Sequence, residues 1–286
     1  MKNNIFQKIF RIFRKKNIHS EQNSVKKNEI SFYSDNMRKY IRADVYLPPT
    51  YDVAKNGDFP VLFINDAQDM NAVRLSETLE RLYRYKRIRP TVVFAFYPTD
   101  RMHEYGTKST PDYLGRGHKA PAYQYFLTQE FLPFAQEKYK LSDRRKDYVT
   151  AGFSLGGLSA FDTAWNYSDI FAKVGVFSGS FWWRSRAFIP HDPDADRIVH
   201  DYVAASPTVP PLEFWLQTGT KDEAADRNNN GIIDSIDDTT DLIKILRAKG
   251  CAAENITYLE VLDGEHNPKT WGEVTGDFLV WAFPVE

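Results

Sequence analysis

The sequence contains a single cysteine, Cys251, among its 286 residues. One thiol cannot form an intramolecular disulfide, so the fold must be stabilised by a buried core, and this cysteine use is typical of a reducing compartment. Net charge is also nearly absent: the chain has 37 Lys and Arg residues and 38 Asp and Glu residues, which gives a net charge of −1. The chain therefore has no overall electrostatic attraction to nucleic acid, and no nucleic-acid partner is expected. No apolar run is long enough to span a bilayer.

The N-terminus lacks the features of a secretory signal peptide. Lys8 and Arg11 interrupt its apolar residues, and no small-residue cleavage site follows them. This absence favours a cytoplasmic protein. The apolar residues between positions 5 and 13 recur at helical spacing, which fits a short helix with weak membrane-surface contact through residues 1–16. A disordered basic tail is the favoured interpretation of the same residues.

The order of patterns along the chain predicts the fold class. Residues 1–28 are expected to form the basic tail and a polar linker, and residues 29–286 one domain with a well-buried core. After a predicted hairpin at 29–34 and 40–47, apolar runs alternate with amphipathic segments. Further strands are expected at 61–65, 91–97, 148–151, 174–177, 213–218 and 256–261, and helices at 72–85, 123–139, 155–165, 239–249 and the C-terminus. This order predicts an α/β fold with a mostly parallel central sheet, an antiparallel N-terminal hairpin and helices on both faces.

The strongest chemical signal is the pentapeptide Gly152-Phe153-Ser154-Leu155-Gly156. It lies between a predicted strand and a predicted helix, which is the context of the nucleophile turn of α/β-hydrolases. Such a turn exposes the serine hydroxyl, and the glycines let strand and helix approach without a Cβ clash. Ser154 is therefore the predicted nucleophile. A glycine-rich turn with an ordinary surface serine is the alternative.

Two backbone N–H groups are expected to stabilise the oxyanion of the reaction. The first belongs to Leu155, because the first N–H groups of a helix point at the site and its dipole favours negative charge. The second should come from the loop after strand 61–65. The N–H of Gln68 is the first choice there, and that of Ala67 is the alternative.

The remaining catalytic groups follow from the chain order serine, acid, histidine. His266 is the only one of six histidines after the last predicted strand, so it is the predicted base. The acid should follow strand 213–218, where Asp222 is the best candidate and Glu223 and Asp226 are alternatives. Its role would be to orient and stabilise the imidazole.

A calcium-loop pattern begins four residues after Asp222. Residues 226–237 fit D-x-[DN]-x-[DN]-G-x5-E, except that Asp237 replaces the final Glu. The expected ligands are oxygen atoms of Asp226, Asn228, Asn230, Asp234 and Asp237, with the carbonyl of Ile232. A structural Ca2+ would make the segment that carries the acid rigid, and it would favour an exported protein. An ordinary Asn- and Asp-rich turn is the alternative.

Several segments between residues 40 and 283 together resemble the enterochelin-esterase-like esterase family, which includes feruloyl esterases. The segments that carry the resemblance are Leu-Pro-Pro at 47–49, Asn-Asp-Ala-Gln-Asp at 65–69, Arg101 with Glu104-Tyr105, the serine turn, and Ser-Gly-Ser-Phe-Trp-Trp at 178–183. The resemblance implies ester hydrolysis by Ser154 and His266, with Arg101 and Trp182 bordering the substrate cleft. From the residues themselves, an ion pair of Arg101 with Glu104 and core packing of one tryptophan are alternatives. The calcium-like insertion departs from the family pattern.

The expected function is hydrolysis of a small-molecule carboxylic ester through an acyl-enzyme, without an organic cofactor. Siderophore-lactone, feruloyl-sugar and acyl-sugar esters all fit an aromatic-rich cleft. The same chemistry with an alcohol acceptor would make an acyltransferase. A non-catalytic carbohydrate-binding module is the alternative from another functional class.

Overall fold

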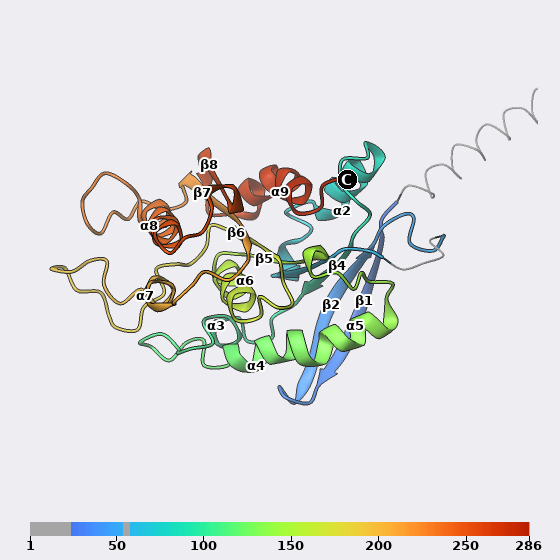
Figure 1. The fold of residues 1–286 in the computed structure, drawn as a ribbon, viewed down its shortest axis with the longest axis horizontal. Helices are drawn as coiled ribbons and strands as arrows, with labels where there is room; N and C mark the ends of the chain where they lie inside the picture. The colour runs from blue at the N-terminus through green and yellow to red at the C-terminus, as the bar shows by residue number, and fades with distance from the viewer. Residues whose placement is uncertain (1–23, 54–57, 286) are drawn as a thin grey trace, which may run out of the picture.

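The computed structural model describes residues 24–53 and 58–285, and an eight-stranded sheet runs through them in the order β1-β2-β4-β3-β5-β6-β7-β8 (Figure 1). The β1–β2 hairpin is antiparallel, β2 pairs antiparallel with β4, and the pairs from β4 to β8 are all parallel. The predicted fold class is therefore confirmed. The strands are β1 Lys26–Ser34, β2 Lys39–Leu47, β3 Val61–Asn65, β4 Val92–Phe96, β5 Tyr148–Phe153, β6 Lys173–Phe177, β7 Glu213–Lys221 and β8 Ile256–Glu265.

The central strands are apolar on both faces because helices cover both. Every residue of β3, β4 and β5 is buried. Neighbouring side chains of a strand point to opposite faces, so Leu62 and Phe63 belong to two separate core clusters. Helices α2 (Leu75–Arg84) and α9 (Pro268–Ala282) pack on the Leu62 side, at the top of Figure 1. The opposite cluster is covered by α4 (Ala120–Tyr125), α5 (Leu132–Lys138), α6 (Leu155–Asn166), α7 (Ile198–Ala205) and α8 (Asp234–Ala248).

Two elements in the N-terminal half of the chain differ from the predicted ones. Strand β1 begins at Lys26, so residues 26–28 pair with β2 instead of forming a linker. The predicted helix 123–139 is divided into α4, a π-helical segment η2 (Phe126–Phe131) and α5. Pro133 lies in the first turn of α5, where its missing N–H is tolerated. The tail proposed to contact a membrane, residues 1–16, lies outside the described residues.

The last two strands are longer than their apolar runs. Strand β7 reaches Lys221 and β8 reaches Glu265, so Asp222 and His266 are the first residues after them. Helix α8 begins at Asp234, five residues earlier than expected. In the described part of the chain, no helix combines the length and the apolar character needed to cross a membrane.

Candidate active site

One edge of the sheet collects the three predicted catalytic residues and two further polar side chains. Asp66, Ser154, Ser178, Asp222 and His266 are the residues that directly follow β3, β5, β6, β7 and β8. These strands are parallel, so their carboxyl ends lie at the same edge, where ligands bind in α/β folds. The first three have positive φ angles of 66°, 53° and 46°, a conformation that is uncommon for residues other than glycine. Such strain is typical of functional sites.

Ser154 lies on a tight turn between β5 and α6, with φ 53° and ψ −121°. The two glycines of the motif are required by this geometry. A Cβ on Gly152 would lie 2.2 Å from the carbonyl oxygen of Gly156, and a Cβ on Gly156 would lie 2.2 Å from Oδ2 of Asp66. The serine turn is therefore packed directly against the loop that follows β3.

The Ser154 hydroxyl is half-buried, and its hydrogen-bond partner is another serine. Its Oγ lies 3.4 Å from Oγ of Ser180, whose backbone N–H also donates to the Ser154 carbonyl at 3.1 Å. Among the described residues, no hydrogen bond joins Ser154 to His266. Sequence reasoning gave Ser180 no role, although it belongs to the Ser-Gly-Ser segment that carried the resemblance.

Asp222 and His266 influence each other electrostatically. Burial raises the pKa of the Asp222 carboxyl, and the Gly219 N–H, the Ser178 hydroxyl and His266 oppose this rise. Desolvation lowers the pKa of the His266 imidazole, the Asp222 charge opposes this, and Arg101 lowers it further. The imidazole is therefore kept neutral near pH 7, as a general base requires.

Trp271 and Ser178 lie next to His266 and Asp222. The indole N–H of Trp271 donates to Ser178 Oγ at 3.0 Å in a buried hydrogen bond. The Trp271 ring stacks on Phe153 at 4.9 Å and meets the edge of the His266 ring at 5.4 Å. The Ser178 hydroxyl lowers the pKa of the Asp222 carboxyl, although neither carboxyl oxygen of Asp222 accepts a hydrogen bond within the described part of the chain, so Trp271 of α9 contacts His266 directly and lies one residue away from Asp222 through Ser178.

Free N–H groups face this edge from two short segments. A 3-10 helix, η1 (Ala67–Asp69), follows Asp66, and its later N–H groups bond within the turn. In the described part of the chain no hydrogen bond engages the N–H of Ala67 or Gln68, nor that of Leu155 at the start of α6. These are the three groups that the sequence proposed for the oxyanion.

Arg101 holds the η1 loop against the serine turn. Its Nε and Nη2 donate to the two oxygens of Asp66 at 2.7 and 3.0 Å, and Nη2 also reaches the Phe153 carbonyl at 3.3 Å. The suggested ion pair with Glu104 is wrong, because Glu104 pairs with Lys39. The guanidinium thus positions the loop through a buried carboxylate, and its side chain remains 34% exposed, so contact with a substrate stays a prediction.

The loops that follow β6 and β7 line an aromatic cavity. Trp182 is 40% exposed and Trp183 is fully buried, so the second tryptophan is the one that packs in the core. Trp182 lines a cavity of 470 Å³ together with Tyr113, Arg184, Phe188, Ala225, Asp226, Arg227 and Asp234. This volume lies within the range of small-molecule sites.

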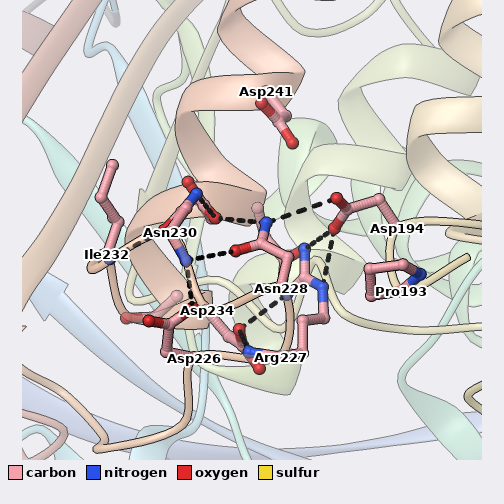
Figure 2. A network of polar contacts seen from close by, with 12 residues as sticks. Pro193, Asp194, Asp226, Arg227, Asn228, Asn230, Ile232, Asp234 and Asp241 are labelled. Carbon is pink, nitrogen blue, oxygen red and sulfur yellow. Dashed lines mark hydrogen bonds and ion pairs between the residues drawn. The ribbon is translucent and has the colours of Figure 1, made fainter. Parts of the chain in front are cut away.

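The predicted calcium loop folds around its own hydrogen bonds (Figure 2). The Asp226 carboxylate accepts from the N–H groups of Asn230 and Gly231 at 3.1 and 2.9 Å. Asp237 accepts from the side-chain amides of Asn228 and Asn230 at 3.0 and 2.7 Å. Four of the six predicted ligands are thus within hydrogen-bond reach of one another.

Of the other two predicted ligands, Asp234 already has a cationic partner. Its Oδ1 accepts from the Arg227 backbone N–H at 2.8 Å and lies 3.3 Å from the Arg227 guanidinium, while Ile232 donates its N–H to Asn230 Oδ1 at 2.8 Å. The described residues contain no group of three or more His, Cys, Asp or Glu side chains arranged to hold a metal ion. The structure therefore does not support the calcium expectation.

Comparison with known proteins identifies one relative over most of the domain and others over part of it. The uncharacterized protein YjcH of Bacillus subtilis (strain 168) is 23% identical over 244 residues, covering 85% of this chain and 91% of YjcH. YbbA of the same organism is 27% identical over 157 residues, which are 52% of this chain and 61% of YbbA. The iron(III) enterobactin esterase of Escherichia coli (strain K12) is 37% identical over 78 residues, 26% of this chain and 20% of that enzyme.

Solved esterases share the fold. A ferulic acid esterase superposes with a TM-score of 0.68 at 18% identity, covering 91% of this chain and 98% of that one. The enterobactin esterase FES from Shigella flexneri superposes with a TM-score of 0.71 at 20% identity, covering 90% of this chain and 58% of the enzyme. The family described as "Putative esterase" matches residues 34–274. The chain thus belongs to this esterase family and is a carboxylic-ester hydrolase with an α/β-hydrolase fold.

Proposed function

We propose that Ser154, His266 and Asp222 act as a catalytic triad that hydrolyses carboxylic esters through an acyl-enzyme. The observation that carries this proposal is the position of Ser154, at a strained strand-to-helix turn beside unbonded N–H groups. Asp222 is preferred as the acid because its charge raises the pKa of the His266 imidazole. Among the described residues, no other carboxylate has this effect on His266. Catalytic hydrogen bonds are often long before substrate binds, so the Ser154–His266 bond is expected to form in the complex.

The reaction follows from these roles. His266 removes the hydroxyl proton while Ser154 Oγ attacks the ester carbonyl carbon. The carbonyl electron pair moves to its oxygen, which accepts hydrogen bonds from the N–H groups of Leu155 and Gln68, with Ala67 as the alternative to Gln68. When the tetrahedral intermediate collapses, the C–O bond breaks and His266 gives the proton to the leaving alcohol. Water then attacks the acyl-enzyme by the same steps, with His266 as the base, and the carboxylic acid product is released from Ser154.

Labelling with a fluorophosphonate probe and hydrolysis of p-nitrophenyl acetate test the proposal. Ser154→Ala should lose both signals. Ser159→Ala is the matched control, since it removes another hydroxyl of α6, one that is buried. Equal labelling of wild type and Ser154→Ala would refute the assignment.

The substrate classes expected from the sequence remain siderophore-lactone, feruloyl-sugar and acyl-sugar esters. The names of the enterobactin and ferulic acid esterases support the first two classes. Product analysis with added alcohols separates hydrolysis from acyl transfer, because a transferase would form a new ester.

We also propose that the loop at residues 226–237 binds Ca2+ after local rearrangement. Support comes from the short distances among Asp226, Asn228, Asn230 and Asp237. The side-chain amide nitrogens of Asn228 and Asn230 now point at the Asp237 carboxylate, and rotating both amides would place their oxygens there instead, where they could bind the ion. The ion would hold the segment after Asp222 and take no part in the chemistry. Ca2+ at 100 times its dissociation constant should raise the unfolding midpoint by about 5 °C. No change between EDTA and Ca2+ would show that the loop needs no ion.

A further inference from the structure

A second serine, Ser180, is held beside the proposed nucleophile by the backbone. Strands β5 and β6 are parallel neighbours, and hydrogen bonds continue between the segments that follow them. The Ser154 N–H donates to the Phe177 carbonyl at 2.8 Å, and the Ser180 N–H donates to the Ser154 carbonyl at 3.1 Å. These two bonds hold the serines side by side, and their Oγ atoms lie 3.4 Å apart.

The turn that carries Ser180 is closely packed. A Cβ on Gly179 would lie 2.5 Å from Cγ1 of Val176 and 3.0 Å from the Phe181 ring, so this turn has little room to shift. Ser180 itself is only 3% exposed. In the described part of the chain, Ser154 Oγ is the one hydrogen-bond partner of the Ser180 hydroxyl. The effect of this hydroxyl is therefore directed at the atom that forms the acyl-enzyme.

The contact between the two hydroxyls is long for a hydrogen bond between neutral groups. O–H···O bonds are usually about 2.7–2.8 Å long, so 3.4 Å indicates a weak bond in the free enzyme. A hydroxyl that donates to a charged oxygen approaches to about 2.5–2.7 Å, and the bond is roughly twice as strong. The Ser180 hydroxyl should therefore contribute most in the step that places negative charge on Ser154 Oγ.

Deacylation is the step in which Ser154 Oγ is the leaving group. Water attacks the acyl carbon while His266 takes a proton from it, and the C–Oγ bond of the tetrahedral intermediate then breaks. The electron pair of that bond moves to Oγ, and His266 gives the proton to this atom. In the acyl-enzyme, Oγ belongs to an ester and is a poor hydrogen-bond acceptor, so a donor beside it stabilises the transition state more than the acyl-enzyme.

We infer that the Ser180 hydroxyl donates a hydrogen bond to Ser154 Oγ as the acyl-enzyme breaks down, and that it accelerates deacylation in this way. The inference rests on the proposed function and adds a donor that acts on the second half of the reaction. Acylation should depend much less on Ser180, because the same contact already exists with the free Ser154 hydroxyl. In the opposite arrangement, Ser154 would donate to Ser180, and removing Ser180 would make acylation faster.

The lifetime of the acyl-enzyme tests this inference. Wild type and Ser180→Ala are acylated with p-nitrophenyl acetate, and the decay of the acyl group is followed by mass spectrometry of the intact protein. Deacylation should be about tenfold slower in the variant, the effect of one lost hydrogen bond to a charged oxygen, whereas kcat/KM should stay within about twofold because it reports acylation. For this activated ester kcat and KM should then fall together, a result that lost packing alone would not produce.

Two more variants complete the experiment. Ser180→Thr keeps the hydroxyl and should restore most of the deacylation rate. Ser159→Ala removes another buried hydroxyl near the serine turn and should leave the lifetime unchanged. Urea unfolding of the same samples shows that each variant is folded.

The possible failures of the two proposals are distinguishable. An unchanged acyl-enzyme lifetime in Ser180→Ala would overturn the role of Ser180 and leave the proposed triad in place, and so would faster acylation without slower deacylation. If wild type formed no acyl-enzyme on Ser154, the proposed function would fail and this inference with it.

Discussion

Replacing Ser178 with alanine tests whether the buried chain from Trp271 to Asp222 serves catalysis. The substitution removes the acceptor of the Trp271 N–H at 3.0 Å and a hydroxyl that interacts with Asp222. Neither carboxyl oxygen of Asp222 accepts a hydrogen bond within the described residues, so the hydroxyl is expected to bond the carboxylate only once His266 becomes charged, and a hydrogen bond to a charged group contributes about 1.5–3 kcal/mol. If that support acts fully in the transition state, kcat/KM should fall about tenfold to hundredfold, since ~1.4 kcal/mol is tenfold. The Asp222 carboxylate should also become harder to ionise.

A double-mutant cycle separates this role from simple packing. Trp271→Phe removes the N–H and one fused ring but keeps an aromatic ring against Phe153, so it should lower kcat/KM about fivefold, the effect of ~1 kcal/mol. If both residues act through one chain, Ser178→Ala with Trp271→Phe should be little worse than Ser178→Ala alone, a coupling of about 1 kcal/mol.

The assay is kcat/KM against pH, with unfolding in urea on the same samples. A shifted acid limb, caused by the altered charge at Asp222, is a signature that lost packing alone would not produce. Two results would refute the reasoning. One is a double variant whose loss in kcat/KM equals the product of the losses in the two single variants. The other is lower stability of Ser178→Ala with an unchanged pH profile.

Three further outcomes are expected. Arg101→Lys should lower kcat more than it changes KM, because a lysine cannot replace the two-pronged contact with Asp66 that holds η1; unchanged steady-state kinetics would contradict this. The acid limb of wild-type kcat/KM should lie below pH 6.5, because desolvation lowers the pKa of the His266 imidazole, and a limb above pH 7 would argue against His266 as the base. Burial lowers the pKa of His200 to about 3, so the unfolded chain binds the extra proton and stability is lost as pH falls from 6.5 towards 3. Between pH 7 and pH 4 this loss is about 3.4 kcal/mol, and His200→Gln should remove most of it in urea unfolding at those two pH values.

The fold was predictable where the apolar pattern determines it. Strands such as β3 are continuous apolar runs because both faces are covered, and Gly152 and Gly156 mark the serine turn because no Cβ fits there. The ends of β7 and β8 were not predictable in the same way. Strand β8 is only partly buried and ends in polar residues, so its apolar run stops before its hydrogen bonding does.

Long-range partners were the part of the site that the sequence could not supply. The sequence suggested Glu104, a neighbour in the chain, as an ion-pair partner of Arg101, whereas its partner in the structure, Asp66, lies 35 positions away. Trp271 and Ser178 are 93 positions apart and carry no spacing signal. One rule would have found several of these residues, because the first residue after each parallel strand faces the ligand edge. Applied to β3 and β6, it selects Asp66 and Ser178.

The loops after β6 and β7 connect the proposed chemistry to the aromatic cavity. The first begins with Ser178, whose hydroxyl lowers the pKa of the Asp222 carboxyl, and continues to Trp182 on the cavity wall. The second begins with Asp222 and continues to Asp226 on the opposite wall. Arg227 joins the two loops through Asp194 at 2.8 Å. A change in this contact should therefore displace both loops together, and with them Trp182 and Asp222.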